Sequence, residues 1–553
     1  MASGSALWGG IIAARWAEQT VERLAEHRAG INAINVFPVA DGDTGSNLYH
    51  TVSSAYRAVA QLPAGATLSD VMAAMTAGAL RGARGNSGLI LSVALQGVSD
   101  ALTGLSVLNA ERFAEALELA AHRVRSAVAD PVEGTMITVL TAMAEQARKC
   151  AEAGDDLVKQ IHAVRARSYE ALRETTGQLD TLTQAQVVDA GSAGLAELMD
   201  LLYITVSHAA YPETVPPISN SDDTYAHEFY PTPHPSYEGV APLPYEGDAV
   251  EHEGDAVELV FFLSEGKRRS RAITQILKKA GGDSIVVSGS RAHVHIGSYH
   301  KALAILERME KYQIQDLRVE RLPGNQIANN SVAHSHIPGH VAIIALVSGV
   351  EFMLHCGILG AHCVNTAVPN WHEHLDELCY SSSTPVIVAP SSYEYWRTIR
   401  SLESRPEVTV VPTTNPAHLI SALAVSDNAE EPALVVEDMT DVVDTMRSGA
   451  LWPVVCHRAG PILGAQTDVL ITVQHSLRAV KPHMLAAACA LFDELLPAET
   501  AEQRSMISVV CGRELSTEKR DAIKTLIAQR YPEIHTEFFT SGDPAYYLAV
   551  GVE

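Results

Sequence analysis

The sequence predicts a multidomain protein with an all-helical N-terminal part, a small α+β part and an α/β part. Its 553 residues, 47% of them hydrophobic, are too many for a single core. Helical periodicity, broken by short glycine-containing segments, runs to about residue 210. From about residue 254 onward, short apolar segments alternate with helical patterns, as they do when helices cover a sheet.

The predicted helical domain covers residues 1–210. Its clearest helical patterns are Ile11 to Ala29, Leu68 to Leu80, Ala110 to Ala127 and Ala193 to Ile204. Residues 211–253 interleave proline with acidic residues and tyrosine, which is typical of an extended linker.

The predicted middle domain, residues 254–325, has the order βαββαβ. Its expected elements are strand 257–263, helix 270–280, strand 284–287, strand 292–296, helix 301–311 and strand 317–319. The C-terminal domain, residues 340–553, is expected to be α/β with a largely parallel sheet. Its expected strands are Val341 to Val347, Pro385 to Ala389, Val408 to Val411, Ala433 to Val436, Leu470 to Val473 and Ile507 to Val510.

Composition narrows the class of protein. A net charge of -25 argues against a nucleic-acid partner or an anionic membrane surface. Seven cysteines without a disulfide-like spacing fit a reducing compartment, so we expect a cytoplasmic protein. Met1 to Trp16 lacks the features of a signal peptide, and no apolar run approaches the roughly 20 residues that span a bilayer.

The segment from Ala33 to Asn47, AINVFPVADGDTGSN, carries the strongest functional motif. Asp41 and Asp43 flank a glycine, and carboxylate oxygens are ligands that Mg²⁺ prefers. Small polar residues follow where a helix is expected to begin, and backbone N–H groups at a helix N-terminus bind phosphate. The segment predicts a metal–nucleotide site. An isolated Asp-Gly-Asp would more often be a solvated turn, but related motifs follow.

Three further glycine-containing breaks precede helical patterns: 82–88 (GARGNSG), 131–136 (PVEGTM) and 187–194 (VVDAGSAG). The first has no Lys-Ser or Lys-Thr pair after it, so it is not a P-loop. Helix capping alone explains any one of these motifs. Four of them within one helical segment favour a shared anion site.

These motifs, in this order, resemble those of the nucleotide-binding L subunit of dihydroxyacetone kinases. The whole chain, with His293-Val-His295 and the ending from Ser541 to Glu553, is most similar to the fatty acid kinase A subunit family. The resemblance implies an eight-helix barrel that holds ATP with Mg²⁺ at one end.

The resemblance also implies roles for individual residues. Asp41 and Asp43 would be the catalytic Mg²⁺ ligands, and Asn35 is the candidate for a third ligand. The residues expected at the phosphates are Thr44, Gly45, Ser46, Asn47, Asn86 and Ser87. Those expected at the nucleoside end are Gly134, Thr135, Asp189 and Gly191.

No histidine or cysteine nucleophile stands among these motifs. The resemblance therefore implies an acceptor on another protein: a fatty acid on a fatty-acid-binding protein of the DegV type, converted to an acyl phosphate. The later domains would be docking and dimerisation surfaces, giving a homodimer. Two alternatives stay open: a glycerone (dihydroxyacetone) kinase, and a regulator that senses nucleotide without turnover.

His293 and His295 share one face of their expected strand, within reach of a common ligand. Related fatty acid kinase proteins have a cysteine on the preceding strand that completes a zinc site. Here that stretch, Asp255 to Glu258, has none, so the pair forms either a hydrogen-bonded structural element or a zinc site with Glu258 as substitute. The histidines and cysteines between His355 and Cys379 match no zinc spacing, and we expect no metal there.

Overall fold

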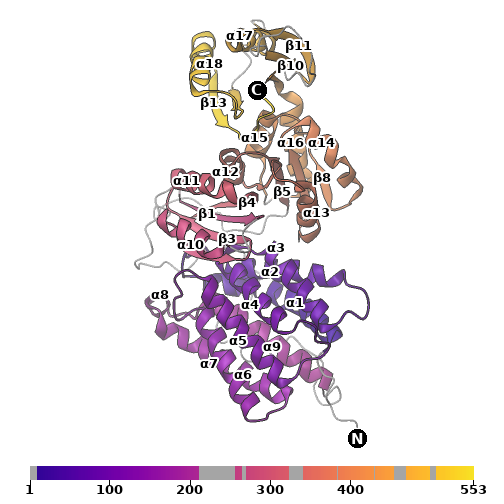
Figure 1. Ribbon diagram of the computed structural model, residues 1–553, viewed down its shortest axis with the longest axis vertical. Helices are drawn as coiled ribbons and strands as arrows, with labels where there is room; N and C mark the ends of the chain where they lie inside the picture. Colours follow the sequence, from indigo (N-terminus) through magenta and orange to yellow (C-terminus); the bar gives the residue numbers. More distant parts are fainter. Residues whose placement is uncertain are drawn as a thin grey trace.

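The computed structural model describes residues 9–210, 256–264, 269–322, 341–382, 384–428, 430–453, 469–497 and 506–553. Its parts are stacked along one long axis (Figure 1). The helical domain lies at one end, an eight-stranded sheet lies in the middle, and a six-stranded sheet lies at the far end. The expected linker, residues 211–253, falls outside the described residues.

The N-terminal domain is helical, as predicted. Its helices are α1 (Gly10–Ala33), α2 (Thr44–Ala60), α3 (Leu68–Gly82), α4 (Gly85–Ala101), α5 (Ala110–Ala127), α6 (Met136–Glu152), α7 (Leu157–Gln178), α8 (Asp180–Ala185) and α9 (Ala190–Ala210). Each long helix packs against the next, and α9 packs against both α7 and α1. The eight long helices therefore close a ring, and the six-residue α8 lies beside α7.

A buried ion-pair network joins α1, α7 and α9. Arg23 Nη1 lies 3.0 Å from Glu197 Oε2 and 3.5 Å from Asp200 Oδ2. His27 Nδ1 lies 3.3 Å from the other Glu197 oxygen, and Arg165 also pairs with Asp200. These charges are shielded from water, so each depends on its partners.

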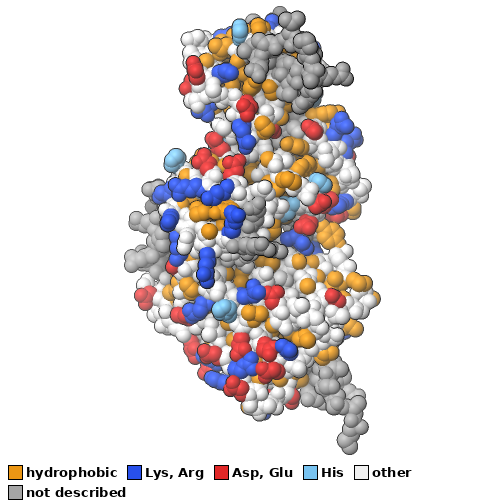
Figure 2. Space-filling model, viewed as in Figure 1, with side chains coloured by type: hydrophobic (Ala, Val, Ile, Leu, Met, Phe, Trp, Pro, Cys, Tyr) orange, Lys and Arg blue, Asp and Glu red, His pale blue; other side chains and the backbone are white. Residues whose placement is uncertain are grey.

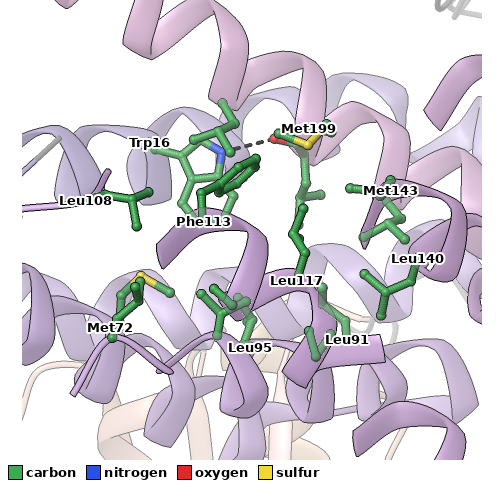
Figure 3. Close-up of a pocket in the computed structure, with 18 residues that line it drawn as sticks. Trp16, Met72, Leu91, Leu95, Leu108, Phe113, Leu117, Leu140, Met143 and Met199 are labelled. Atoms are coloured by element: carbon green, nitrogen blue, oxygen red, sulfur yellow. Dashed lines mark hydrogen bonds between the residues drawn. The ribbon is translucent and has the colours of Figure 1, made fainter. Parts of the chain in front are cut away.

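The centre of the ring holds a cavity of about 90 Å³ lined entirely by apolar residues (Figure 3). Trp16 and Phe113 point into it, and the indole N–H of Trp16 is satisfied by the carbonyl of Leu198 at 3.1 Å. Small-molecule sites usually measure about 300–1,000 Å³ and include polar groups. The size and apolar lining of this cavity do not suit a nucleotide.

An eight-stranded sheet runs from the middle domain into the C-terminal domain. Its strands are β1 (Val257–Leu263), β2 (Asp283–Ser288), β3 (Arg291–Ile296), β4 (Ile314–Arg321), β5 (Ala342–Val347), β6 (His362–Asn365), β7 (Val386–Pro390) and β8 (Val408–Val410), in the order β2-β3-β1-β4-β6-β5-β7-β8. With α10 (Ser270–Lys279) and α11 (Tyr299–Met309), the first four strands follow the predicted βαββαβ order. The antiparallel pairing of β4 with β6 continues this unit into the next domain.

The described residues of the C-terminal part also form seven α-helices and a second sheet. The helices are α12 (Val350–Ile358), α13 (Trp371–Ser381), α14 (Tyr393–Ile399), α15 (Pro416–Val425), α16 (Pro432–Thr445), α17 (Met484–Leu495) and α18 (Thr517–Arg530). The second sheet has the order β11-β10-β9-β14-β12-β13, formed by β9 (Arg447–Pro453), β10 (Val469–Val473), β11 (Ser476–Lys481), β12 (Met506–Cys511), β13 (His535–Thr540) and β14 (Leu548–Val552).

Two expectations for this part are wrong. Residues 433–436 belong to α16, which begins at Pro432 and buries Val435, Met439 and Val443 at a helical spacing of four. The β-branched pair Val435-Val436 therefore packs as a helix face. The sheet is also mixed: β5 pairs in parallel with β6 and β7, whereas the second sheet is antiparallel except for β12 with β13.

The two faces of the first sheet differ in chemistry. Leu259, Phe261 and Val294 lie on a face whose buried apolar cluster includes residues of α10, α11 and α12. The opposite face is polar and lies against the helical domain, where α4 contacts β2 and β3.

Figure 2 shows Lys and Arg side chains gathered over α10 and α11, so basic residues cluster locally in this acidic chain.

Hydrogen bonds join the sheet to the helical domain. The backbone N–H of Ala129 donates to the carbonyl of Ile285 at 3.0 Å. Lys278 Nζ lies 2.7 Å from Asp130 Oδ1, beside the same segment. The polar face of the sheet is thus held over the helical ring, at the end where α4 begins.

Candidate functional site

The loop before α2 orients the first aspartate through a hydrogen-bond chain. Asn35 Nδ2 donates to Asp41 Oδ1 at 2.5 Å, and Thr44 Oγ1 donates to Asn35 Oδ1 at 2.9 Å. Both polar side-chain atoms of Asn35 are engaged in this way. Asn35 therefore orients Asp41 in this arrangement, and one lone pair of its Oδ1 is already used by Thr44.

The next residues of the loop are held against α1. Ser46 N donates to Asn32 Oδ1 at 3.1 Å, and Asn32 Nδ2 donates to Ser46 Oγ at 3.0 Å. A Cβ on Gly45 would lie 2.3 Å from the carbonyl oxygen of Arg28, so only glycine allows this close approach. The start of α2 is therefore fixed by α1, and the Ser46 hydroxyl keeps its proton available for a ligand.

The helix that begins at Gly85 lies directly against α2. Gly85 has φ +55°, and a Cβ there would lie 2.3 Å from Asn47 Nδ2. A Cβ on Gly88 would lie 2.4 Å from Thr51 Oγ1. The glycines predicted as a phosphate cradle therefore bring the N-termini of α2 and α4 together.

The N-termini of α6 and α9 meet at the same place. A Cβ on Gly191 would lie 2.8 Å from Met136 and 3.4 Å from Ser87 Oγ. Gly134, with φ +83°, donates its N–H to Thr138 Oγ1 at 2.9 Å just before α6. Four helix N-termini thus converge, and their partial positive charges add at one point.

Asp189 caps α9. Its Oδ2 accepts from the N–H and the hydroxyl of Ser192 at 2.7 and 2.6 Å. Burial raises its pKa to about 6, although the Ser192 bonds oppose this. Thr135 stands at the N-cap position of α6, but its hydroxyl donates to the Val132 carbonyl at 2.8 Å. Both residues hold their loops in place in this structure.

Two observations fit a bound Mg²⁺–nucleotide. Asn86 Oδ1 is buried without a hydrogen-bond partner among the described residues, at the convergence of the helix N-termini. Burial, the neighbouring Asp43 and Glu258 together raise the pKa of Asp41 well above its usual value, although the Asn35 hydrogen bond lowers it. A divalent cation would offset this crowding of carboxylates.

Glu258 lies on the polar face of the sheet, with two histidines beside it. Its carboxylate oxygens lie 3.0 Å from His293 Nε2 and 3.8 Å from His295 Nε2. The register explains this grouping, because Glu258 pairs with His295 and Val260 with His293. Since Glu258 also acts electrostatically on Asp41, this cluster faces the loop before α2.

The three side chains could hold a metal ion. Their ligand atoms lie within 4.8 Å of one another, and all three residues are buried. The far ring nitrogen of His293 is held as in many metal-binding histidines, because His293 Nδ1 lies 3.1 Å from the Ser284 carbonyl. His295 Nδ1 lies 3.6 Å from Asp283 Oδ1, which is beyond hydrogen-bond distance. The alternative to a metal ion is a proton on His293, held by Glu258. Burial opposes it, but Glu258 and the Ser284 carbonyl raise the pKa of His293 above 6.5.

Sequence reasoning missed a second buried cluster on the same face. Asp316 Oδ2 lies 2.7 Å from His374 Nε2, and its other oxygen lies 3.4 Å from His362 Nε2. Burial alone would raise the pKa of Asp316, but Arg291 and the two histidines hold it well below its usual value. In the sequence, the spacing of these histidines can be compared only with metal-binding patterns, and it does not indicate that they lie beside Asp316. The alternation of Asp316, Arg318 and Glu320 with apolar residues is the signal that indicates a polar face.

The helical ring, the converging N-termini and the carboxylate pair are the features expected of a nucleotide-binding domain of a kinase-like class. Residues 38–203 match the DAK2 domain, and residues 359–553 match the C-terminal domain family of FakA-like fatty acid kinase proteins. With both matches in one chain, the protein belongs to the fatty acid kinase A subunit family, with a DhaL-type N-terminal domain.

Relatives match along nearly the whole length. Protein YloV of Bacillus subtilis (strain 168) is 24% identical over 552 residues, covering 96% of this chain and 97% of that protein. An uncharacterized protein of Staphylococcus saprophyticus is 35% identical over 178 residues, which cover 32% of each chain.

Solved structures of DegV-family proteins align to part of the chain. A Corynebacterium glutamicum DegV family protein covers 38% of this chain and 96% of its own, with 12% identity and a TM-score of 0.28. Similarity at this level supports no conclusion about fold or ligand. None of the helices in the described part of the chain combines the length and apolar character needed to cross a bilayer.

Proposed function

We propose that this chain is the ATP-binding catalytic subunit of a fatty acid kinase. In this reaction a carboxylate oxygen of the fatty acid attacks the γ-phosphorus of ATP, and the bond from that phosphorus to the β–γ bridging oxygen breaks. The products are acyl phosphate and ADP, and no proton needs to be transferred. The observation that carries the proposal is the convergence of four helix N-termini beside Asp41 and Asp43, in a family of kinases.

The residues of this chain would mainly position and neutralise charge, which is most of what phosphoryl transfer requires. Asp41 and Asp43 would hold Mg²⁺, and Asn35 would orient Asp41. The bound ion would supply positive charge between the phosphates. The phosphates would receive hydrogen bonds from the N-termini of α2 and α4, with Ser46, Asn47, Asn86 and Ser87 as the side-chain partners. The nucleoside would lie toward Gly134, Thr135, Asp189 and Gly191.

The acceptor would reach the site on a separate DegV-type fatty-acid-binding protein. The large apolar pocket needed for an acyl chain is not provided by the cavity in the helical ring, which measures only about 90 Å³. The family to which the C-terminal part belongs also points to the fatty acid kinase system. We further propose that the protein is a cytoplasmic homodimer.

The test compares acceptors at fixed protein and Mg²⁺–ATP concentrations. ADP release should rise strongly with oleate-loaded DegV-type protein and should stay at background with that protein stripped of lipid, with free oleate, or with dihydroxyacetone. Stimulation by dihydroxyacetone alone would indicate a glycerone kinase. Nucleotide binding with no turnover under every condition would indicate a nucleotide-sensing regulator.

A further inference from the structure

Two arginines from different domains approach each other at the candidate nucleotide site. Arg84 is the N-cap residue of α4, beside the glycines that contact α2. Arg318 lies in the middle of β4, on the polar face of the sheet. Each guanidinium acts electrostatically on the buried imidazole of His50 in α2. The two positive charges therefore lie on either side of the interface between ring and sheet.

The position of Arg318 follows from strand register. Val260 of β1 is paired with Arg318 on one side and with His293 on the other, so these side chains share one face. Glu258 is flanked in the same way by His295 and Glu320. Arg318 thus belongs to the same surface as the carboxylate that acts on Asp41.

Arg318 is anchored on one side only. Its Nη2 lies 3.4 Å from His362 Nδ1, and the far nitrogen of that ring lies 3.4 Å from Asp316. Its Nη1 is buried and has no hydrogen-bond partner in the part of the chain that the structure describes. A buried charged donor left without an acceptor is costly, so this nitrogen has room for one more acceptor than the described residues supply.

Arg84 lies near the same place and is half-buried. Glu320 and Asp43 are near enough to act electrostatically on its guanidinium. Burial, and next the charge of Arg318, lower the pKa of Arg84 to about 9. His50 does not add charge, because burial and the surrounding arginines lower its pKa to about 2. Two guanidinium groups from different domains thus lie near Asp43 and Glu320.

We propose that Arg84 and Arg318 bind the terminal phosphate of the nucleotide from opposite sides, Arg318 reaching it across the domain interface. Arginine suits this role because its planar donors match phosphate oxygens. An arginine supplied by a second domain stabilises the charge of the transferred phosphoryl group in other nucleotide enzymes. The inference rests on the proposed function in one respect: it takes the anion to be the γ-phosphate.

In this arrangement the sheet contributes a residue, Arg318, that binds the nucleotide. The terminal phosphate is the part of ATP that ADP lacks, so Arg318 contributes to binding of ATP and not of ADP. The helical ring alone holds Asp41, Asp43 and Arg84 but lacks Arg318. Phosphoryl transfer would therefore require the sheet to be seated on the ring.

The test is calorimetric titration of the full chain with Mg²⁺ and either ADP or the non-hydrolysable β,γ-imido analogue of ATP. Arg318→Gln should lower the affinity for the analogue by about 10-fold, because a charge-assisted hydrogen bond is lost. The affinity for ADP should change by no more than about 2-fold. Arg84→Gln should show the same selectivity, and Arg318→Lys should lie between. The matched control is Arg321→Gln, which removes an exposed charge from the end of the same strand and should change neither affinity.

Acceptor-dependent ADP release gives the second readout. It should fall on the order of 10³-fold in Arg318→Gln, as for other arginines that act on a transferred phosphoryl group. Equal weakening of ADP and the analogue, or no weakening of either, would overturn the inference. Selective loss of the analogue in a chain that makes no acyl phosphate would refute the proposed function and keep the inference. Full acyl-phosphate production by Arg318→Gln would refute the inference and support the proposed function.

Discussion

Glu258, on the first strand of the central sheet, acts on Asp41 in the loop that begins the helical nucleotide site. Burial and Asp43 raise the pKa of Asp41 first, and the carboxylate of Glu258 adds to the effect. Residues more than two hundred positions apart thus contribute to one buried acidic centre. The Asp41–Asp43 pair of the helical domain and the histidine cluster of the sheet therefore lie near each other across the domain interface.

The first prediction concerns the two aspartates. Asp41→Asn or Asp43→Asn keeps the size of the side chain but removes one negative charge from the Mg²⁺ site. Turnover should fall on the order of 10²-fold or more, as with other losses of preorganised charge stabilisation. Steady-state kinetics and calorimetry with Mg²⁺–ATP measure both effects. The matched control is Glu152→Gln, an exposed carboxylate at the end of α6, which should leave both unchanged. Normal affinity and turnover in both aspartate variants would remove these residues from the site.

The second prediction concerns the pH dependence of stability through Asp189. Its pKa is raised by burial from 3.8 to about 6, so its favourable contribution is complete below the unfolded value and is lost as pH rises through about 6. The difference of two pKa units corresponds to roughly 3 kcal/mol as an upper bound. Asp189→Asn should therefore become more stable relative to the unmodified protein as pH rises from about 4 to 7. Denaturant unfolding of the helical domain at a series of pH values measures this change. A stability difference that is constant with pH would contradict the assignment.

The third prediction concerns zinc. The stretch from Asp255 to Glu258 contains no cysteine, so the sequence predicts no tightly bound zinc in the middle domain. The structure supplies Glu258 as a third ligand atom, but a proton on His293 competes for the same position. Elemental analysis of protein purified without added metal should find far less than one zinc per chain. A stoichiometric zinc that disappears in His293→Ala/His295→Ala would show that Glu258 replaces the thiolate.

The fourth prediction concerns the ion-pair network between α1 and α9. Arg23→Met leaves Glu197 and Asp200 buried with fewer partners, at 1% and 5% exposure. Loss of one member of a buried network costs about 3–5 kcal/mol, so the helical domain should unfold at clearly lower denaturant concentration. Arg15→Met, at an exposed position of the same helix, should have little effect. Equal midpoints for the two variants would show that the network is not a major source of stability.

The helical domain and its loops were the most predictable part of the chain. Glycine before a helix has a local cause, either a positive φ or a close approach, and Gly85 and Gly45 show both. Such local requirements are visible in a window of a few residues. Helix periodicity likewise placed the predicted helix 110–127 at the observed bounds of α5.

Long-range pairing was less predictable. Nothing local in the sequence indicates that β4 pairs with β6, or that the sheet crosses from one expected domain into the next. The polar side chains of β1, β3 and β4 are far apart in the sequence, and only the strand register places Glu258 beside His295 and Glu320. Burial of Arg318 depends on the same register and on the helical domain opposite, so its role was not visible from composition or spacing.

The most direct test of the central claim is a product analysis of a single reaction. Full-length protein is mixed with Mg²⁺, ATP labelled in the γ-phosphate, and a DegV-type protein loaded with oleate. Hydroxylamine is added in parallel to convert any acyl phosphate to a hydroxamate. We expect labelled acyl phosphate that is trapped by hydroxylamine and is absent with Asp41→Asn. Release of the label only as free phosphate, at the same rate with and without the loaded partner, would contradict the central claim.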